Sequence, residues 1–374
     1  MSRIHLVVLY GGQSAEHDVS CVTAAHVLAA VDPAKYRVTP IGISTSGEWM
    51  LSEGAQAALD AGPGALPSRL EVAGPAVSVG DIVAAGGAGA VTAEHDADRD
   101  IDHELTVVLP LLHGPLGEDG TVQGLLELAN AVYVGSGVLG SALSMDKAMA
   151  KQVLAVNGIP QARFRAFGEH ELTPGLPAEI AADLGLPCFV KPSNMGSSVG
   201  VTKAHDVEEL RDAIDYALGY DEWVVVEEAI TGREIEVAVL GGTSPEASGA
   251  GEIVPGEEFY TYEDKYVTDG AQLLIPAPLT PEQTTEVRDL AVRVFKTLRC
   301  DGLARIDFFL EEGAEGRPGR GFLCNEANTM PGFTPISMYP KLWQAAGVSY
   351  PELIDRLVDL AVARSQRRRR NTKH

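Results

Sequence analysis

The stretch IHLVVLYGGQSAEHDVSCVTAAHVLAAV, residues 4–31, decides how the first part of the chain folds. Residues 4–10 are largely apolar and predict a buried strand, which a Gly-Gly turn follows. Residues 19–31 repeat apolar side chains at helical spacing, and Asp18 stands where a side chain can cap that helix. A strand that runs into an amphipathic helix in this way is typical of a parallel, doubly wound α/β sheet.

The same alternation continues toward residue 139. Residues 38–43 and 105–112 predict further buried strands, and residues 121–130 predict a helix after a glycine-rich loop. Residues 52–100 are instead rich in Ala and Gly with weak periodicity, and we interpret them as a variable, loosely structured elaboration. We therefore expect an N-terminal α/β domain at residues 1–139.

Two more units of mixed α and β structure are predicted after it. One long helix is expected at 139–156, where Asn-Gly-Ile-Pro ends it. Strands are predicted at 188–191, 200–202, 223–228, 233–240, 303–310 and 322–326, and helices at 206–217, 281–298 and 350–363. This order indicates a central unit at 140–230 and a C-terminal unit at 231–374.

The composition excludes several classes of protein. A chain of 374 residues with 45% hydrophobic residues can form two or three well-packed domains. Its 29 basic and 52 acidic residues give a net charge of -23, which disfavours binding to nucleic acid or to a membrane surface. The arginine run at 367–370 is interpreted as a solvated chain end.

The sequence also carries no sign of export. Four cysteines are scattered along the chain without CxxC spacing, the N-terminus enters a strand without a signal-peptide pattern, and no apolar run reaches the ~18 residues of a membrane span. We therefore expect a cytoplasmic protein.

The run KPSNMGSSVG, residues 191–200, predicts a phosphate-binding loop. It follows an apolar strand, and its glycines and serines allow a tight turn whose amides and hydroxyls can surround a triphosphate. Because Lys191 precedes the glycines, the run is not a Walker A loop. An ordinary hairpin turn is the alternative interpretation.

A second set of polar residues lies on two predicted strands of the last unit. Arg305 and Asp307 are two residues apart and share one strand face, as do Glu326 and Asn328. If the strands pair, Asp307, Glu326 and Asn328 gather as oxygen ligands beside Arg305, a set that suits Mg²⁺ rather than zinc. A surface network of ion pairs is the alternative.

The run HGPLGEDG, residues 113–120, follows a buried strand and precedes a helix. Ligands of open α/β sheets gather at the carboxyl ends of strands, and the amides of the following helix point to the same place. His113 at this position has either a structural or a catalytic role.

These motifs resemble those of the D-alanine:D-alanine ligases. HGPLGEDGTVQG (113–124) and ARID with NEANTMPG (304–307 and 325–332) are similar to the two signature segments of that family, and KPSNMGSSVGVTK (191–203), GGQSAEHDVS (11–20) and MDK (145–147) are further family-like runs. Because five separate motifs occur in the family's order between residues 6 and 337, coincidence is improbable. The resemblance implies an ATP-grasp fold, in which two α+β domains clamp ATP and an N-terminal α/β domain helps to bind substrate.

The resemblance also implies a reaction. Members of the family phosphorylate one D-alanine with ATP, and the amine of a second D-alanine then attacks the acyl phosphate to give the dipeptide for peptidoglycan. Such a transfer depends mainly on positioning and charge neutralisation. The family further implies two Mg²⁺ (or Mn²⁺) ions and a homodimer.

The nucleotide-binding residues implied by the resemblance come from several motifs. Lys147 and Lys191, with Ser198, would hold the phosphates, while Glu227 and Glu234 would bind the adenine amino group and the ribose. Asp307, Glu326 and Asn328 would hold the metal ions. Lys265 would meet the γ-phosphate from a lid at 255–272.

The substrate-binding residues follow in the same way. Glu16 would accept the ammonium group of the first D-alanine, with Ser197 and Tyr266 orienting it and His113 nearby. Arg305 and the backbone N–H of Gly332 would form an oxyanion hole, and Ser337 would bind the carboxylate of the second substrate.

Two departures from the family pattern stand out. The stretch 311–321, between the halves of the metal motif, is longer than the family leads us to expect, and Glu228 follows Glu227 where some relatives carry another residue. Three alternatives to the ligase stay open: a related ligase that uses D-lactate or D-serine, a nucleotide-binding sensor without activity, and a dinucleotide oxidoreductase. The last is disfavoured because Gly11-Gly12-Gln13 is not a GxGxxG motif.

Overall fold

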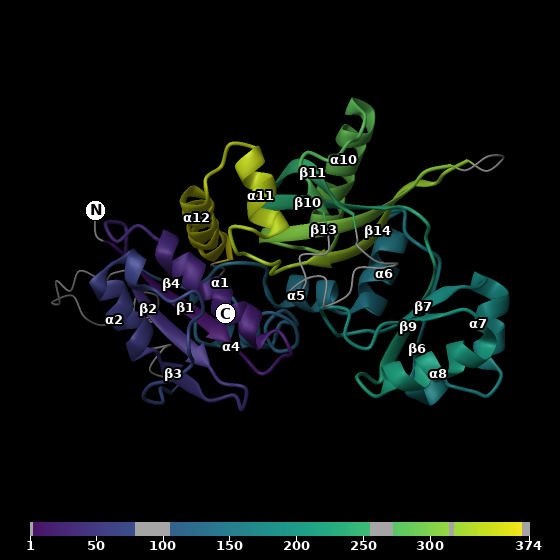
Figure 1. The fold of residues 1–374 in the computed structure, drawn as a ribbon, viewed down its shortest axis with the longest axis horizontal. Helices are drawn as coiled ribbons and strands as arrows, with labels where there is room; N and C mark the ends of the chain where they lie inside the picture. The colour runs from purple at the N-terminus through teal and green to yellow at the C-terminus, as the bar shows by residue number, and fades with distance from the viewer. Residues whose placement is uncertain (1–2, 79–104, 255–271, 314–317, 369–374) are drawn as a thin grey trace, which may run out of the picture.

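The computed structural model describes residues 3–78, 105–254, 272–313 and 318–368. Three separate sheets organise these residues, and each sheet packs against helices (Figure 1). The predicted combination of α/β and α+β structure is confirmed. Among the described residues, no helix has both the length and the apolar character needed to cross a membrane.

The N-terminal sheet is doubly wound, as predicted. Its strand order is β3-β2-β1-β4-β5, with β1, β2, β4 and β5 parallel. Val8 of β1 packs in the same core as α1, whereas its neighbour Val7 packs in a second core that contains residues of α4. The elements are β1 (Ile4–Gly11), α1 (His17–Ala30), β2 (Tyr36–Ile43), β3 (Trp49–Leu51), α2 (Glu53–Ala61), the short 3-10 helix η1 (Pro63–Ala65), β4 (Thr106–Pro110), α4 (Thr121–Leu128) and β5 (Val132–Tyr133).

Two expectations for this unit are wrong. Asp18 does not cap α1, because the helix begins at His17, two residues earlier than expected, and Asp18 instead forms an ion pair with Arg69 at 2.7 Å. The segment 52–78 is not loosely structured either, since it contains α2 and buries Leu70 in the core. Residues 79–104, the rest of that elaboration, lie outside the described residues.

The single long helix expected at 139–156 is in fact two helices, α5 (Val138–Met145) and α6 (Lys147–Val156). Asp146 between them has an extended backbone, and its side chain accepts a hydrogen bond from the Met149 N–H at 2.9 Å. An aspartate that caps the second helix therefore breaks a pattern that looks continuous in sequence. The break places Lys147 at the first turn of α6.

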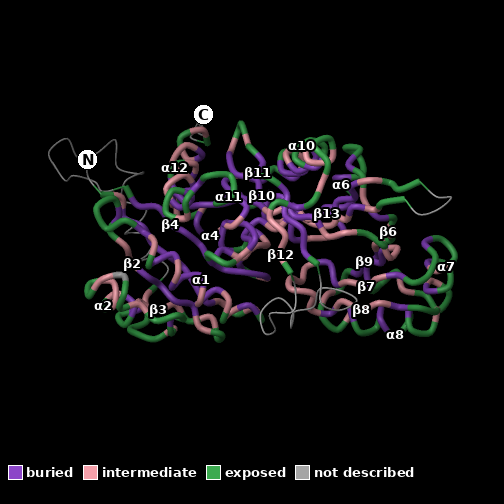
Figure 2. The backbone as a smooth tube through the Cα atoms, turned by 45° about the horizontal axis from the view of Figure 1, so that its top comes forward, coloured by how far each residue is buried: buried purple, intermediate pink, exposed green. Residues whose placement is uncertain are grey.

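The central sheet has the order β6-β9-β7-β8, and all its pairings are antiparallel. Its elements are β6 (Phe164–Gly168), η2 (Glu169–Glu171), α7 (Leu176–Leu184), β7 (Cys188–Pro192), β8 (Thr202–Ala204), α8 (Val207–Leu218) and β9 (Trp223–Glu228). Helices α7 and α8 cover one face through a small apolar core. Figure 2 shows that the exposed segments of this unit lie mainly on these outer helices.

The C-terminal sheet has the order β12-β11-β10-β13-β14 and is antiparallel. Its elements are β10 (Arg233–Gly241), β11 (Glu246–Val254), β12 (Gln272–Leu274), α10 (Pro281–Thr297), β13 (Gly302–Glu311), β14 (Gly321–Asn328), α11 (Met338–Ala345) and α12 (Tyr350–Arg368). Helix α10 packs on one face, and so does α6, although α6 precedes the central sheet in the chain.

Helices α11 and α12 join this sheet to the N-terminal unit. Their apolar residues belong to the same core cluster as β1 and α1, and Figure 1 shows α12 between the two units. Arg367 and Arg368 lie in α12 and pair with Asp301 and Glu127. The interpretation of the basic run as a solvated end is therefore wrong for these two residues, while 369–370 lie outside the described residues.

Candidate active site

A cavity of 430 Å³ lies between the central and C-terminal sheets. Ten of the residues singled out in the sequence line it, and they come from α6, β7, the loop after β7, β9, β10, β13 and β14: Lys147, Lys191, Ser197, Ser198, Glu227, Glu234, Arg305, Asp307, Glu326 and Asn328. The fold thus gathers motifs that lie more than a hundred residues apart. Lys265, Tyr266 and residues 255–271 of the expected lid lie outside the described residues.

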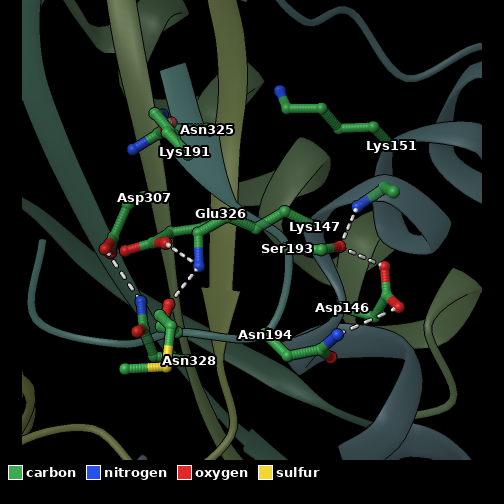
Figure 3. A network of polar contacts seen from close by, with 12 residues as sticks. Asp146, Lys147, Lys151, Lys191, Ser193, Asn194, Asp307, Asn325, Glu326 and Asn328 are labelled. Atoms are coloured by element: carbon green, nitrogen blue, oxygen red, sulfur yellow. Dashed lines mark hydrogen bonds and ion pairs between the residues drawn. The ribbon is translucent and has the colours of Figure 1, made fainter. Parts of the chain in front are cut away.

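Strands β13 and β14 pair as predicted. Arg305 lies opposite Asn328, and Asp307 lies opposite Glu326. The Asn328 side-chain amide donates a hydrogen bond to Asp307 Oδ2 at 2.9 Å (Figure 3). The ladder shifts its register directly after Asp307. The pairing therefore brings two carboxylates and one amide together on one face.

Arg305 is held between two acidic side chains. Its Nε donates to Asp307 Oδ1 at 2.7 Å and lies 3.2 Å from Glu236 Oε2, and a second guanidinium nitrogen donates to Asp307 Oδ2 at 2.8 Å. Burial alone would lower the pKa of Arg305, but Asp307 and Glu236 outweigh it and raise the pKa well above its usual value. We missed Glu236 in the sequence, although it shares a face of β10 with Glu234.

The donor set fits a hard cation held jointly with phosphate. Within the described ranges, no three His, Cys, Asp or Glu side chains cluster as a complete protein metal site. Asp307, Glu326 and Asn328 offer oxygen atoms only, which is the ligand type of Mg²⁺, an ion that takes its remaining ligands from phosphate and water. The arrangement is therefore compatible with a metal ion that arrives with a nucleotide.

Two lysines of the cavity lie close to acidic side chains. Lys147 Nζ donates to the Met195 carbonyl at 2.6 Å and lies 3.9 Å from Glu326 Oε2. Burial lowers the pKa of Lys147, and Glu326 partly opposes this shift. Lys191 Nζ lies 3.3 Å from both Asn325 Oδ1 and Glu227 Oε1.

A third lysine was missed in the sequence. Lys151 is 2% exposed and its Nζ lies 3.3 Å from Glu227 Oε1, so that Glu227 pairs with two ammonium groups. Burial raises the pKa of Glu227, but Lys151 and Lys191 outweigh it and bring the pKa below its usual value. The helical spacing from Lys147 puts Lys151 one turn further along α6, which is the signal that could have identified it.

The phosphate loop is tied to the start of α6. Ser193 Oγ donates to Asp146 Oδ1 at 2.6 Å and accepts from the Ala148 N–H at 3.1 Å, contacts that Figure 3 shows beside Asn194. Ser197 and Ser198 have φ angles of 49° and 60°, a left-handed backbone that is uncommon outside glycine. The loop connects the antiparallel strands β7 and β8, so it is a hairpin connection, and its two left-handed serines give it a strained backbone.

Glu16 lies where three segments meet. It is 8% exposed at the start of α1, and Ser197 Oγ donates a hydrogen bond to its Oε1. A Cβ atom added at Gly114 or at Gly196 would lie 2.8 Å or 2.9 Å from its Oε2. The 113–120 loop and the phosphate loop therefore both lie against the carboxylate, which a larger side chain at either glycine would displace.

His113 is 4% exposed, and its Nδ1 lies 3.0 Å from the Met330 carbonyl oxygen. That contact requires a proton on Nδ1, so that Nε2 is an acceptor when the ring is neutral, and Nε2 has no hydrogen-bond partner among the described residues. Burial lowers the pKa of His113, and the charge of Glu16 only partly opposes the shift. The imidazole is therefore neutral.

Glu118 was also missed as a site residue, although it lies in the quoted HGPLGEDG run. Its Oε2 accepts from the Gly114 N–H at 2.8 Å and its Oε1 from the Met330 N–H at 2.9 Å. Burial, and then the charge of Glu16, raise the pKa of Glu118 to about 8. Glu118 and His113 thus hold both sides of Met330 and fix the chain that leads to Gly332.

Gly332 and Ser337 are also brought together. A Cβ atom at Gly332 would lie 3.1 Å from Ser337 Oγ, and Ser337 occupies the N-cap position of α11. The first amides of a helix favour an anion, so a carboxylate is suited to this place.

Glu228 has a different environment from Glu227. Its carboxylate accepts hydrogen bonds from the Arg163 backbone N–H at 2.8 Å and from the Arg320 guanidinium at 2.6 Å. The residue that departs from the family pattern is therefore engaged by arginines of the protein itself.

Two models of one protein family match the two halves of the chain. The model described as D-ala D-ala ligase N-terminus matches residues 5–136, and the one described as D-ala D-ala ligase C-terminus matches residues 153–359. A D-alanine--D-alanine ligase from Acetivibrio thermocellus is 45% identical over 365 residues, which are 96% of each chain. The ligase of the same name from Geobacillus thermodenitrificans is 45% identical over 362 residues, 96% of this chain and 95% of the relative.

Solved structures agree with these matches. A D-alanine-D-alanine ligase from Coxiella burnetii is similar with a TM-score of 0.77 and 34% identity, covering 98% of this chain and 96% of the other. A D-Ala:D-Ser ligase from Enterococcus faecalis is similar with a TM-score of 0.76 and 34% identity, covering 96% of this chain and 99% of the other. The chain belongs to the D-alanine–D-alanine ligase family and has its ATP-grasp fold.

Proposed function

We propose that this chain is an ADP-forming ligase that joins two D-alanine molecules into D-alanyl-D-alanine, the dipeptide of peptidoglycan precursors. Family membership over the whole chain supports the reaction. The single structural observation that carries it is the position of Glu16, a buried carboxylate in contact with the phosphate loop through Ser197. An acceptor for a substrate ammonium group therefore lies beside the place where a triphosphate would bind.

ATP occupies the 430 Å³ cavity in this proposal. Lys147, Lys191 and Ser198 hold the phosphates, Glu227 accepts from the adenine amino group, and Glu234 binds the ribose. Two Mg²⁺ or Mn²⁺ ions, held by Asp307, Glu326 and Asn328, would supply charge neutralisation at the phosphates. Lys265 and the lid at 255–272 complete the site in the proposal.

The residues around Glu16 act on the first D-alanine. Glu16 binds its ammonium group, and Ser197 and Tyr266 orient Glu16, so that the substrate carboxylate faces the γ-phosphate. Transfer of the γ-phosphoryl group gives an acyl phosphate and ADP. Phosphate is a good leaving group, so the carbonyl carbon then becomes open to attack by an amine.

The amine of the second D-alanine attacks that carbonyl, and phosphate leaves from the tetrahedral intermediate. Arg305 uses only part of its five donors on Asp307, so it can also donate to the developing oxyanion together with the Gly332 N–H. Ser337 and the start of α11 bind the carboxylate of the second substrate. His113 Nε2 is a neutral acceptor, which either orients a substrate or takes the proton of the attacking amine.

A related second substrate is the rival proposal, and the similarity to a D-Ala:D-Ser ligase structure favours testing it. The test is a phosphate-release assay with D-alanine, L-alanine, D-serine and D-lactate, in which the mass of each product is measured. We expect D-alanyl-D-alanine as the main product. Predominant formation of a depsipeptide or of D-alanyl-D-serine would contradict the proposal, and nucleotide binding without any product would favour the sensor.

Assembly, location and domain limits are further proposals. We propose a cytoplasmic homodimer, by analogy with the family, and domains at 1–139, 140–230 and 231–374. Light scattering after gel filtration should give twice the 39.5 kDa of one chain. Separate expression of residues 1–139 should give a folded protein if the first of these domain limits is correct.

A further inference from the structure

Two segments of the chain cross between the central sheet and the C-terminal sheet. One is residues 159–163, before β6, and the other is residues 229–232, after β9. They lie side by side, because the Glu228 N–H donates to the Arg163 carbonyl at 3.0 Å. The first also contacts β14, since the Cys324 N–H donates to the Pro160 carbonyl at 2.8 Å. Any change in the angle between the sheets must bend both crossings.

The Glu228 side chain joins the two crossings a second time. Its Oε1 accepts from the Arg163 N–H at 2.8 Å, and its Oε2 accepts from Arg163 Nε at 3.2 Å. The rest of the Arg163 guanidinium donates to the carbonyls of Asp183 and Leu184, at the end of α7. Glu228 is thereby fixed to the frame of the central unit.

Arg320 adds the link to the other sheet. Its Nε and one amino group donate to Glu311 of β13 at 2.5 Å and 2.9 Å, and its other amino group donates to Glu228 Oε1 at 2.6 Å. One guanidinium therefore holds a carboxylate from each sheet. Figure 1 shows that β13 and β14 extend as a hairpin beyond the rest of their sheet, and Arg320 stands directly before β14.

This inter-sheet bridge, formed by Glu311, Arg320, Glu228 and Arg163, lies at the wall of the cavity. Glu228 lines the cavity, and so do Ile230 and Gly232 of the second crossing. The bridge uses Arg320, which belongs to the stretch 311–321 that is longer than expected for the family. Its four residues lie outside the motif runs that carry the family resemblance.

We propose that Arg320 is a positioning residue for the nucleotide, which acts through Glu228 on the second crossing. The bridge holds the two sheets at the angle that presents residues 229–232 to the adenosine end of the cavity. The inference rests on the proposed function in one respect, namely that ATP binds in this cavity. Arg320 itself touches no reacting atom.

The expected effect is on affinity more than on stability. Single ion pairs that are partly exposed to solvent add little to the free energy of unfolding, and the Arg320 side chain is 34% exposed. The affinity for ATP is more sensitive to the bridge. The apparent dissociation constant equals the intrinsic one divided by the fraction of molecules whose two sheets lie at the binding-competent angle, so it rises as that fraction falls. Because such a bridge contributes about 1 kcal/mol, loss of the charged hydrogen bonds of Arg320 should weaken ATP binding by about threefold to fivefold.

The main experiment compares Arg320→Gln with Arg356→Gln in the full chain. Arg356 is a matched control, since it is 40% exposed and also pairs with two carboxylates, Glu246 and Glu352, but both belong to the C-terminal unit. The dissociation constant of ATP is measured by calorimetry, and kcat and both KM values by phosphate release. For Arg320→Gln we expect the dissociation constant and the KM for ATP to rise about threefold to fivefold, while kcat and the KM for D-alanine change less than about twofold. Arg356→Gln should resemble the unchanged enzyme.

A second pair of variants separates positioning from folding. Arg320→Lys keeps the charge but cannot hold two carboxylates in one plane, so it should fall between the unchanged enzyme and Arg320→Gln. Glu228→Gln should weaken ATP binding as well, and the double variant should be no weaker than the poorer single variant, because both changes break the same bridge.

The outcomes are distinct. Unchanged ATP affinity in Arg320→Gln, with or without a lower melting temperature, overturns the proposal, and so does an equal effect in Arg356→Gln. Additive effects of the two substitutions overturn it too. If the unchanged chain forms no dipeptide from D-alanine and ATP, the proposed function fails instead, whereas ATP affinity still reports on the bridge.

Discussion

At the proposed nucleotide end, the cavity between the two sheets, ion pairs stabilise the charged forms of Glu227 and Arg305, whereas at the proposed substrate end, around Glu16, burial stabilises the neutral forms of His113 and Glu118. Burial disfavours the charged form in both places. Near the cavity, paired charges overcome burial, so that the pKa of Glu227 is lowered and that of Arg305 is raised. Near Glu16, burial dominates, so that the pKa of His113 is lowered and that of Glu118 is raised. The difference lies in the partners: Glu227 and Arg305 pair with oppositely charged side chains, whereas His113 and Glu118, within the described residues, bond only to backbone groups, and the nearby charge of Glu16 raises the pKa of both.

This comparison suggests how each end responds to substitution. A buried ion that loses its partner keeps the full cost of its lost hydration, so changes at the nucleotide end should be severe. Where a neutral ionisable group is bonded to backbone atoms, no side-chain substitution removes its partners. Its contribution to the free energy of unfolding therefore changes mainly with pH. Lys147 is the exception at the nucleotide end, because burial lowers its pKa as well. It lies where a phosphate would supply the missing negative charge.

The largest effect should follow Asp307→Asn. The carboxylate is the shared partner of Arg305 and Asn328 and a proposed metal ligand, so its charge serves both roles. We expect kcat to fall at least about 10³-fold while the fold persists, because Arg305 retains Glu236. Phosphate release over a range of Mg²⁺ concentrations measures the effect. Glu312→Gln, which changes an exposed carboxylate just beyond β13, is the control, and near-normal turnover of Asp307→Asn at low Mg²⁺ would refute the metal assignment.

Arg305→Lys should come next. Lysine keeps the positive charge but not the planar set of donors that reaches Asp307 and an oxyanion at once. We expect kcat to fall about 10²–10³-fold, the usual consequence of losing one oxyanion donor, while the dissociation constant of ATP changes only a few-fold. Calorimetry with ATP and steady-state kinetics on the same protein separate the two quantities. Equal losses in both would make Arg305 a phosphate ligand instead.

Lys151→Met tests the ion pairs of Glu227, the proposed acceptor for the adenine amino group. The substitution leaves Glu227 with Lys191 as its remaining ammonium partner, so the carboxylate becomes less well compensated. We expect a loss of about 2 kcal/mol in the free energy of unfolding, less than for a fully broken buried pair, and a roughly tenfold weaker ATP affinity. Urea unfolding and calorimetry measure the two effects. Lys296→Met on the exposed side of α10 is the control, and identical behaviour of the two variants would speak against a role for Lys151.

The sequence predicted the residues that line the cavity better than it predicted the buried charged residues that contact them. Alternation along a strand fixes which side chains share a face, so the grouping of Arg305, Asp307, Glu326 and Asn328 could be inferred before any coordinates. Glu236, Lys151 and Glu118 were missed because their partners come from other elements of the fold. A charged residue in an otherwise apolar strand or helix is ambiguous until those partners are known.

The errors in the fold have the same origin. The pattern of residues 139–156 is helical throughout, and the break at Asp146 depends on the Asp146 side chain and on Ser193, which lies 47 residues further along. The segment 52–78 has weak periodicity, yet Leu70 is buried under α1, and the Glu71 carbonyl accepts from the Tyr10 hydroxyl at 2.9 Å. Tertiary contacts, not local pattern, order that segment.

The smallest effect concerns the pH dependence of stability at the substrate end, through Glu118. Its pKa is about 8 in the folded chain, above its usual 4.5, so the folded state binds the proton more tightly than the unfolded state does. The stabilising contribution is therefore complete below pH 4.5, declines as the pH rises, and is lost above about pH 8.

Glu118→Gln stays neutral throughout and should lack this decline. Because the N–H groups of Gly114 and Met330 favour the ionised carboxylate and oppose the shift, we expect the difference between the two proteins to change by only about 1 kcal/mol between pH 5 and pH 8. Urea unfolding at half-unit pH steps measures it, with Glu169→Gln as a control whose carboxylate is exposed. The contrary outcome is a difference in the free energy of unfolding that stays constant with pH, or that grows in favour of the unchanged chain toward high pH. Either result would mean that Glu118 is ionised in the folded chain, and that the proposed substrate end stabilises charged side chains just as the nucleotide end does.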